Sequence, residues 1–457
     1  MIGLQPPQTT VKLPAPPNWQ APLPHGGKLM ELKAWWQQFN DPLLLHLIDQ
    51  AQTVSPSIAS AKSRIEQARA KKVGATAALL PDLTANASGS RGLESLFFPA
   101  ATIGSIGLQT RWELDLFGGN QAAQDAAQAR VEGATASWHD ARVLVAAEVA
   151  NQYNILRSCE AQVAFAQTDA NSRSETSRLT ENMSQAGLKP PADAALASAS
   201  SAQARNTLLT QSAQCDLAIK ALVALTGDAE PKLRKRLQVA SGKLAQPVSM
   251  TVTAIPGELL AQRPDIIAAG QEVIAASADI TQYQAQRYPK ISFSGKISMM
   301  QLDVAPAPKG GTVWSIGPLA VTLPLFDGGL RVANVEAARA RYTEASLIFT
   351  GKIRSAVREV EEALVNLHSM GQRNEEVAKA VAGFNTAFAA KEELYKVGLV
   401  SLIELEESRR LAVQAKTGQL QLRRDQIAAW ISLYRALGGG WTTAEAGKVE
   451  PQKALFN

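Results

Sequence analysis

The chain has 457 residues, of which 46% are hydrophobic, 19% charged and only 5% aromatic. This length can fill several cores, but so few aromatic residues favour long helices packed through small side chains. The 46 basic and 41 acidic residues are interspersed, which argues against nucleic acid as a partner. No HExxH, GxxxxGK[ST] or GxSxG motif is present and the four histidines lie far apart, so we expect neither an enzyme nor a metal or other cofactor.

The chain begins with a segment that has no apolar period. From Pro6 to Pro24 it is rich in proline, which predicts an extended arm over about residues 1–31, with ordered structure from Leu32. No run of 18 apolar residues occurs, which excludes a transmembrane helix but would not reveal membrane-spanning strands. A helix is expected over about 54–78, because Pro81 stops the helical period.

Two amphipathic strands follow this helix. Apolar and polar residues alternate over 83–90 and again over 106–116, which gives each strand one apolar and one polar face. The same order returns later in the chain, with a helix over about 265–286 and strands over 291–299 and 319–325. Each half of the chain therefore contributes two strands.

A long helix follows each strand pair. The helical period runs from Gly119 to Gly187 and again from Gly329 to Gly398, about 68 residues or roughly 100 Å of helix. Return helices are expected over about 192–225 and 402–437. Gly118, Gly119, Gly328 and Gly329 mark the junctions between strand and helix, while Gly187 and Gly398 mark the turns at the helix tips. In the second helix the apolar positions step by four and three, as in a coiled-coil seam, at Ile353, Val357, Val360, Leu364 and Leu367.

These two halves are copies of one unit. Matching residues recur at an offset that grows only from 208 to 212 along the unit, which is hard to obtain by chance. We divide the chain into a first repeat (32–227), a linker and equatorial segment (228–257), a second repeat (258–441) and a tail (442–457). The matched pairs are Pro56 with Pro264, Leu80–Leu83 with Tyr288–Ile291, Leu116-Phe117 with Leu325-Phe326, Gly187-Leu188 with Gly398-Leu399, and Ala224-Leu225 with Ala436-Leu437.

Four such strands cannot close a barrel within one chain, and open edges are not tolerated in lipid. Two chains would give eight strands with a filled interior, whereas three would give twelve and leave a channel. The alternative is a soluble sandwich whose core holds the apolar faces. The long helices favour the barrel, because a compact domain has no place for them.

Several short motifs stand out along the two repeats. They are Trp35-Trp36, Phe39-Asn40-Asp41-Pro42, Arg263-Pro264-Asp265-Ile266, Arg287-Tyr288-Pro289 and Leu323-Pro324-Leu325-Phe326-Asp327-Gly328-Gly329. Each motif is weak by itself, but together they resemble the outer membrane factors, the trimeric exit ducts of Gram-negative tripartite efflux pumps and type I secretion systems, and in particular their NodT-type lipoproteins. The resemblance extends from about Leu32 to Trp441.

This resemblance implies a mostly helical fold with a transmembrane β-barrel. Three chains would supply twelve strands in the outer membrane, above a periplasmic α-barrel of twelve helices. The implied partners are two further copies of the chain, a periplasmic adaptor, an inner-membrane pump of the RND type and outer-membrane lipid. A short helical insert over about 232–245 would belong to an equatorial belt. The competing function is a periplasmic coiled-coil adaptor or scaffold protein, which needs only one helical hairpin and no lipid-facing strands.

The resemblance also implies a gate at the second tip. Ile403 and Glu407 match positions that family members use for apolar and acidic rings at a closed entrance, with Glu404 beside them. The alternative is an ordinary first helical turn, in which acidic residues favour the helix dipole.

Many members begin with a lipidated cysteine, whereas residue 1 is Met here and the first cysteine is Cys159. Either the lipidated residue was replaced or this member lacks the anchor.

Cys159 and Cys215 are the only cysteines. If the first long helix and its return helix form an antiparallel hairpin around Gly187, the two cysteines become level, since each lies 28 residues from the turn. The periplasm permits disulfides, so we expect the two to be bonded; two small buried thiols are the alternative.

Overall fold

The computed structural model describes residues 15–16, 19–21, 32–92, 100–242, 260–303 and 309–439. Most of the predicted arm, the end of the predicted linker segment and the predicted tail (442–457) lie outside these residues. The chain divides into two compact units. One contains Ala61–Ser137 and Ile266–Lys352, and the other contains the rest of the described residues. Each unit is described by itself below.

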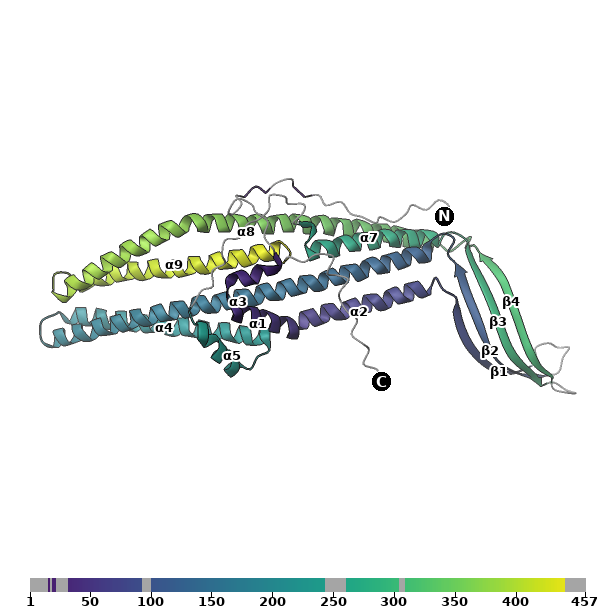
Figure 1. Ribbon diagram of the computed structural model, residues 1–457, viewed down its shortest axis with the longest axis horizontal. Helices are drawn as coiled ribbons and strands as arrows, with labels where there is room; N and C mark the ends of the chain where they lie inside the picture. The colour runs from purple at the N-terminus through teal and green to yellow at the C-terminus, as the bar shows by residue number, and fades with distance from the viewer. Residues whose placement is uncertain are drawn as a thin grey trace. The chain divides into compact units, whose positions relative to one another are not determined.

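The described residues confirm two copies of one order of elements (Figure 1). The helices before the strands have 22 residues each, and the long helices have 67 each. The first copy comprises the 3₁₀ helix η2 (Leu32–Phe39), α1 (Pro42–Val54), α2 (Pro56–Ala77), β1 (Asp82–Gly92), β2 (Ala101–Leu114), α3 (Gly119–Gln185) and α4 (Pro191–Thr226). After α5 (Glu230–Leu237) and η3 (Gln238–Ala240), the second comprises α7 (Pro264–Ala285), β3 (Lys290–Asp303), β4 (Lys309–Thr322), α8 (Leu330–Lys396) and α9 (Leu402–Ala436).

Some predicted boundaries were wrong. The helix expected over 54–78 begins at Pro56, because the proline disfavours helical geometry at Ser55, which is extended. The strands expected over 106–116 and 319–325 start earlier and end earlier than predicted. β2 ends at Leu114 and β4 at Thr322, just before Pro324, which has no N–H to donate. In the predicted insert over 232–245, α5 and η3 end at Ala240, and 243–245 lie outside the described residues.

The four strands form one antiparallel sheet in the order β1-β2-β3-β4 (Figure 1). β2 and β3 pair from Thr102 with Asp303 to Leu114 with Ile291, so the middle of the sheet is the contact between the two copies. On one face the apolar side chains are exposed, including those of Ile106, Met299 and Trp314. Exposed apolar side chains do not form the core of a sandwich, so the sandwich alternative is wrong.

In the same unit as the sheet, α3 and α7 pack closely together because the residues at their contact are small. Ala126 and Ala129 of α3 form a buried cluster with Ala275 and Ala278 of α7. Beside it, Arg130 of α3 lies 2.6 Å from a carboxylate oxygen of Asp279 of α7. This alanine contact again joins the first copy to the second.

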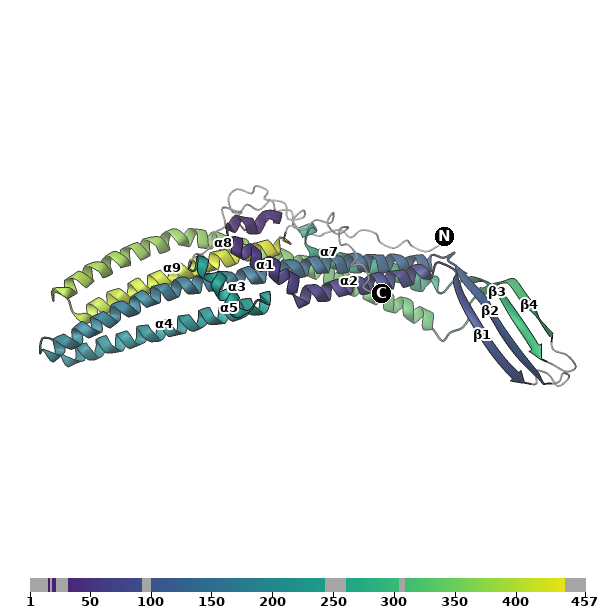
Figure 2. The same cartoon turned by 60° about the horizontal axis from the view of Figure 1, so that its bottom comes forward.

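In the other unit α3 lies beside α4, and α8 beside α9 (Figures 1 and 2). In the predicted seam of α8, Ile353, Val360, Leu364 and Leu367 are buried and Val357 is half-buried. None of the described helices has an apolar stretch long enough to cross a membrane.

Candidate functional site at the helical tips

Both helical hairpins turn in the same way. Gly187 and Gly398 have φ angles of 75° and 79°, in the left-handed region that favours glycine. In each turn the residue after the glycine donates its backbone N–H back into the long helix: Leu188 to Met183 O at 2.8 Å, and Leu399 to Leu394 O at 2.9 Å. Glycine therefore ends α3 and α8 by one shared mechanism.

The first turns of α9 present two different faces. Leu402 and Leu405 are buried and form a cluster with Ala197 of α4. Ile403, by contrast, is 66% exposed, and the side chain of Glu407 is 56% exposed. Because i and i+4 share a helix face, Ile403 and Glu407 lie together on the side that points away from the α4 contact.

Glu404 forms the start of α9. Its carboxylate accepts the backbone N–H of Ser401 at 2.9 Å, while the Ser401 hydroxyl accepts the N–H of Glu404 at 3.2 Å, which completes a capping box. The hydrogen bond from the Ser401 backbone, together with that from its hydroxyl and the charge of Lys391, lowers the pKa of Glu404. Helix capping therefore accounts for Glu404 without any further role.

Glu407 is held by a neighbour on the same helix. The Arg410 guanidinium donates to both carboxylate oxygens, at 2.6 and 3.0 Å. The hydrogen bonds from Arg410, with its charge, lower the pKa of Glu407. Glu407 is therefore an anion at neutral pH, and it is exposed on the face that also carries Ile403.

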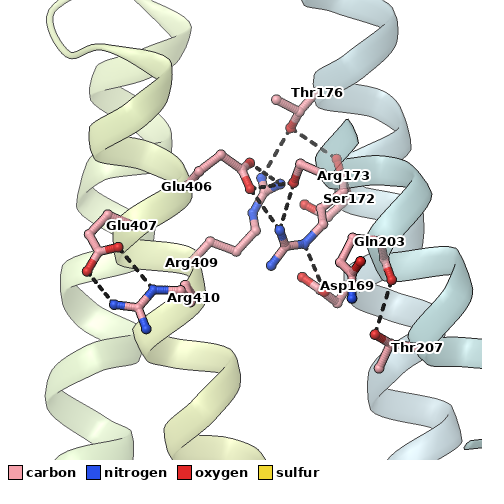
Figure 3. A network of polar contacts seen from close by, with 11 residues as sticks. Asp169, Ser172, Arg173, Thr176, Gln203, Thr207, Glu406, Glu407, Arg409 and Arg410 are labelled. Atoms are coloured by element: carbon pink, nitrogen blue, oxygen red, sulfur yellow. Dashed lines mark hydrogen bonds and ion pairs between the residues drawn. The ribbon is translucent and has the colours of Figure 1, made fainter. Parts of the chain in front are cut away.

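Next to this face, a buried set of charges connects the two hairpins (Figure 3). Glu406 of α9 accepts hydrogen bonds from Arg173 of α3 at 2.8 Å and from the Ser200 hydroxyl of α4 at 2.6 Å. Its other oxygen accepts from Arg409 at 3.0 Å. Arg173 also donates to Asp169 at 2.9 Å. We call these four charged residues, Asp169, Arg173, Glu406 and Arg409, the tip network.

The tip network is charge-balanced and largely removed from water. Arg409 is only 2% exposed; it donates to the Thr176 hydroxyl at 3.1 Å and lies 5.3 Å from the ring centroid of Phe388. Burial lowers the pKa of Arg409, a cost that the charge of Glu406 partly offsets. Since a buried cation without a carboxylate would be strongly unfavourable, the position of Glu406 is tightly constrained.

A second link lies one helical turn closer to the tips. The hydroxyls of Thr180 in α3 and Tyr395 in α8 share a hydrogen bond of 2.9 Å, and the Lys189 ammonium lies 5.4 Å from the Tyr395 ring centroid. Together with the tip network, these contacts hold the first hairpin against the second.

The first hairpin carries a covalent bond. A disulfide connects Cys159 of α3 to Cys215 of α4, with Cα atoms 5.5 Å apart. The second hairpin has no counterpart, because the chain contains no other cysteine.

We expect this bond in the protein isolated from an oxidising compartment. Mass spectrometry of non-reduced, alkylated protein should show neither Cys159 nor Cys215 modified, and the peptides that contain them should be joined. After reduction both should take up the alkylating reagent. Labelling of both cysteines before reduction would contradict the pairing.

The four junction glycines differ in their roles. Gly118, Gly328 and Gly329 have positive φ angles, whereas Gly119 lets α3 approach α7: a Cβ there would lie 2.8 Å from Ala285 Cβ. Sequence reasoning missed the aspartates that cap the helices at these junctions. Asp115 accepts the N–H of Gln121 at 2.7 Å, and Asp327 accepts that of Arg331 at 3.2 Å. An aspartate close to a Gly-Gly pair was the available signal.

Residues of the motifs that resemble the outer membrane factors make packing contacts and hydrogen bonds away from the helical tips. Arg263 is buried, donates to Ala436 O at the end of α9 and pairs with Asp265 and Glu359. The Tyr153 hydroxyl donates to Asp41, which caps α1. Trp35 and Trp36 contact the ring of Tyr434. Among the described residues, no group of three or more metal-ligating side chains occurs.

Comparisons with known proteins agree with this architecture. A family model described as outer membrane efflux protein matches residues 47–228 and 255–439. The pyoverdine export outer membrane protein OpmQ of Pseudomonas aeruginosa is 28% identical over 454 residues, which cover 95% of this chain and 93% of that protein. Nodulation protein T of Rhizobium leguminosarum bv. trifolii is 28% identical over 435 residues, covering 91% and 89%. The solved structure of the outer-membrane channel OprN has the same fold, with a TM-score of 0.83 at 23% identity over 94% of this chain and 98% of that one.

Proposed function

The chain belongs to the outer membrane efflux protein family and is an outer-membrane efflux channel, and we propose that three copies of it form one continuous duct. The observation that carries this proposal is the sheet. It has four antiparallel strands and one exposed apolar face, and within the described part of the chain its two outer strands have no further strand beside them. Three such sheets would close a twelve-stranded barrel with the apolar face toward lipid and the polar face toward water.

In this duct the 67-residue helices would continue the channel into the periplasm. The adaptor alternative fails, because the family match and the relatives are those of the outer-membrane component. A periplasmic adaptor and an inner-membrane pump of the RND type would supply and drive the substrate. The duct itself would catalyse nothing and need no cofactor, and its selectivity would rest with the pump.

We place the closed entrance at the second tip, at Ile403 and Glu407. Support comes from their exposure on one face of α9, because a threefold axis on that side would bring three isoleucines and three carboxylates together. Like charges at short range repel, so such a ring closes only while something else holds the helices together. The tip network and the Thr180–Tyr395 hydrogen bond are placed to do so. Glu404 belongs to the capping box and contributes less.

Alanine at both Ile403 and Glu407 should raise single-channel conductance in planar bilayers severalfold, because it truncates the side chains that form the narrowest point of the closed entrance. A matched control is Leu188→Ala, which shortens an equally exposed apolar side chain at the other tip and should leave conductance unchanged. If the double variant conducts like the unmodified protein, the entrance lies elsewhere. If Leu188→Ala opens the duct as much, both tips contribute.

A further inference from the structure

We propose that Arg111 and Lys296, in the middle of the sheet, give the duct a preference for anions, so that molecules with a net negative charge pass its strand-lined section most readily. This inference rests on the proposed trimeric duct, in which the polar face of the sheet lines the water-filled channel. It adds a property of the duct itself: the pump would still choose the substrate, while the sheet would favour one sign of charge.

Arg111 and Lys296 lie on the same face of the sheet. Arg111 of β2 pairs with Ser294 of β3, which stands two residues before Lys296. Since side chains alternate along a strand, this face is opposite to the one that exposes Ile106. Arg111 and Lys296 are therefore diagonal neighbours on adjacent strands, and such residues lie about 7–8 Å apart. Both side chains are exposed, so two like charges face water side by side.

No counter-charge holds these two cations in place. Within the described part of the chain, neither Arg111 nor Lys296 uses its side chain in an ion pair or a hydrogen bond. The residues that flank Lys296 on this face, across to both neighbouring strands and along its own strand, are polar but neutral: Gln109, Ser315, Ser294 and Ser298. The two cations therefore do nothing for the stability of the sheet that the structure shows.

One carboxylate lies near them. Asp82 of β1 is directly opposite Arg111 in the strand register. Further along the same face, Lys290 and Glu113 pair with each other at 3.2 Å and so balance. We call Arg111, Lys296 and Asp82 the charged belt. Two cations against one carboxylate leave the belt of each chain with a net positive charge.

The sheet is irregular at the level of the belt. The register between β3 and β4 shifts between Phe293 and Gly295, next to Lys296, as it does at a β-bulge. Bulges bend a strand and redirect its side chains, and they are over-represented beside functional sites. This irregularity singles out the same level of the sheet as the charges do, and it is independent of them.

Closing three sheets into one barrel would bring the charged belts of three chains together around the channel. Charges of one sign inside a wall of low dielectric constant focus their field on the water between them and concentrate ions of the opposite sign. Pores that select anions are lined by rings of arginine and lysine. On an open surface the same side chains would have solvent and salt on all sides, so the closed barrel is what gives them an effect.

Reversal potentials in planar bilayers test the charged belt. The measurements use the Ile403→Ala, Glu407→Ala variant as background, so that carboxylates at the tip do not set the preference. In a potassium chloride gradient the ratio of chloride to potassium permeability should fall severalfold with Lys296→Gln and with Arg111→Gln, and furthest with both. Asp82→Asn should raise the ratio, because it removes the carboxylate that opposes the two cations.

Two controls in the same background separate the belt from a general loss of charge. Arg91→Gln removes one exposed cation from the opposite face of β1, since Arg91 pairs with Thr102. Changing Lys290 and Glu113 together to glutamine removes a balanced pair from the same face. Neither control should change the permeability ratio. If Arg91→Gln lowers it as much as Lys296→Gln does, the position of the charge on the sheet is irrelevant and the proposal fails.

Block by citrate, a trivalent anion, gives a second readout. Citrate should reduce the potassium chloride current through the background variant, and Lys296→Gln should raise the concentration needed for half-block severalfold. The difference should shrink between about 0.1 M and about 1 M salt, because the screening length falls from about 10 Å to about 3 Å. Equal block with and without Lys296 would show that anions are not held at the charged belt.

The outcomes separate this proposal from that of the duct. A protein that is monomeric in detergent by native mass spectrometry, or that forms no channel in the bilayer, overturns the duct and the belt together. A trimer that conducts, but whose permeability ratio stays the same with Lys296→Gln and with Arg111→Gln, overturns the belt alone and leaves the duct intact.

Discussion

Glu406→Gln should release the second hairpin from the first. The substitution removes the carboxylate that accepts hydrogen bonds from both Arg173 and Arg409, and the buried Arg409 loses the anion to which it is hydrogen-bonded. Breaking a buried pair by removing one partner costs about 3–5 kcal/mol. Hydrogen exchange at the start of α9 should therefore accelerate by about a hundredfold or more, since each 1.4 kcal/mol is a factor of about ten.

Two further variants make this expectation specific. Glu407→Gln breaks the neighbouring exposed pair with Arg410 and should leave the exchange rates of α9 nearly unchanged, because exposed pairs contribute little. Adding Arg409→Met to Glu406→Gln removes the stranded cation and should restore part of the protection. If Glu406→Gln exchanges like the unmodified protein, the tip network does not hold the hairpins together.

The second large effect should come from Arg263→Ala. This guanidinium joins three elements: it donates to Ala436 O at 2.8 Å and to Asp265 at 2.9 Å, and it reaches Glu359 of α8 at 3.0 Å. Its loss removes the cation that lies between two partly buried carboxylates and takes a donor from a helix-terminal carbonyl, at a cost of about 3 kcal/mol. Thermal unfolding followed by circular dichroism in detergent should show a midpoint several degrees lower.

Arg358→Ala is the matched control for this experiment. Arg358 lies on α8 next to Glu359, but its side chain is 68% exposed and its nitrogen is 3.7 Å from Glu362. Such a pair contributes little, so the midpoint should hardly move. Equal shifts in the two variants would mean that general loss of surface charge, rather than the Arg263 contacts, lowers stability.

The sequence predicted the elements whose signals are local. Pro56, Pro264 and the glycines of the tips act on their own backbone, so the helices that they bound were found within a few residues. The repeat then supplied the order of elements in the second half. Strand ends were less accurate: alternation continues through Leu116 and Leu325, and only the paired backbone shows that β2 ends at Leu114 and β4 at Thr322.

The tip network could not be predicted in the same way. Arg173 and Glu406 are 233 residues apart in the sequence and meet only because two hairpins lie side by side. Within α9 a signal did exist, since Leu402, Leu405 and Arg409 follow a helical period and Glu406 stands three residues before Arg409. A charged residue in line with buried leucines indicates a buried charge that needs a partner, but it does not identify that partner.

The disulfide between α3 and α4 has a consequence for how such a duct could open. Only the first hairpin of each chain contains a disulfide. In a trimer, hairpins with and without this bond would therefore alternate around the threefold axis. The bond prevents α3 and α4 from sliding past each other, so an opening movement that shifts the two helices of a hairpin against each other would be confined to every second hairpin. The entrance would then widen with threefold rather than sixfold symmetry, and the disulfide-bonded hairpins would keep their internal geometry while the duct is open.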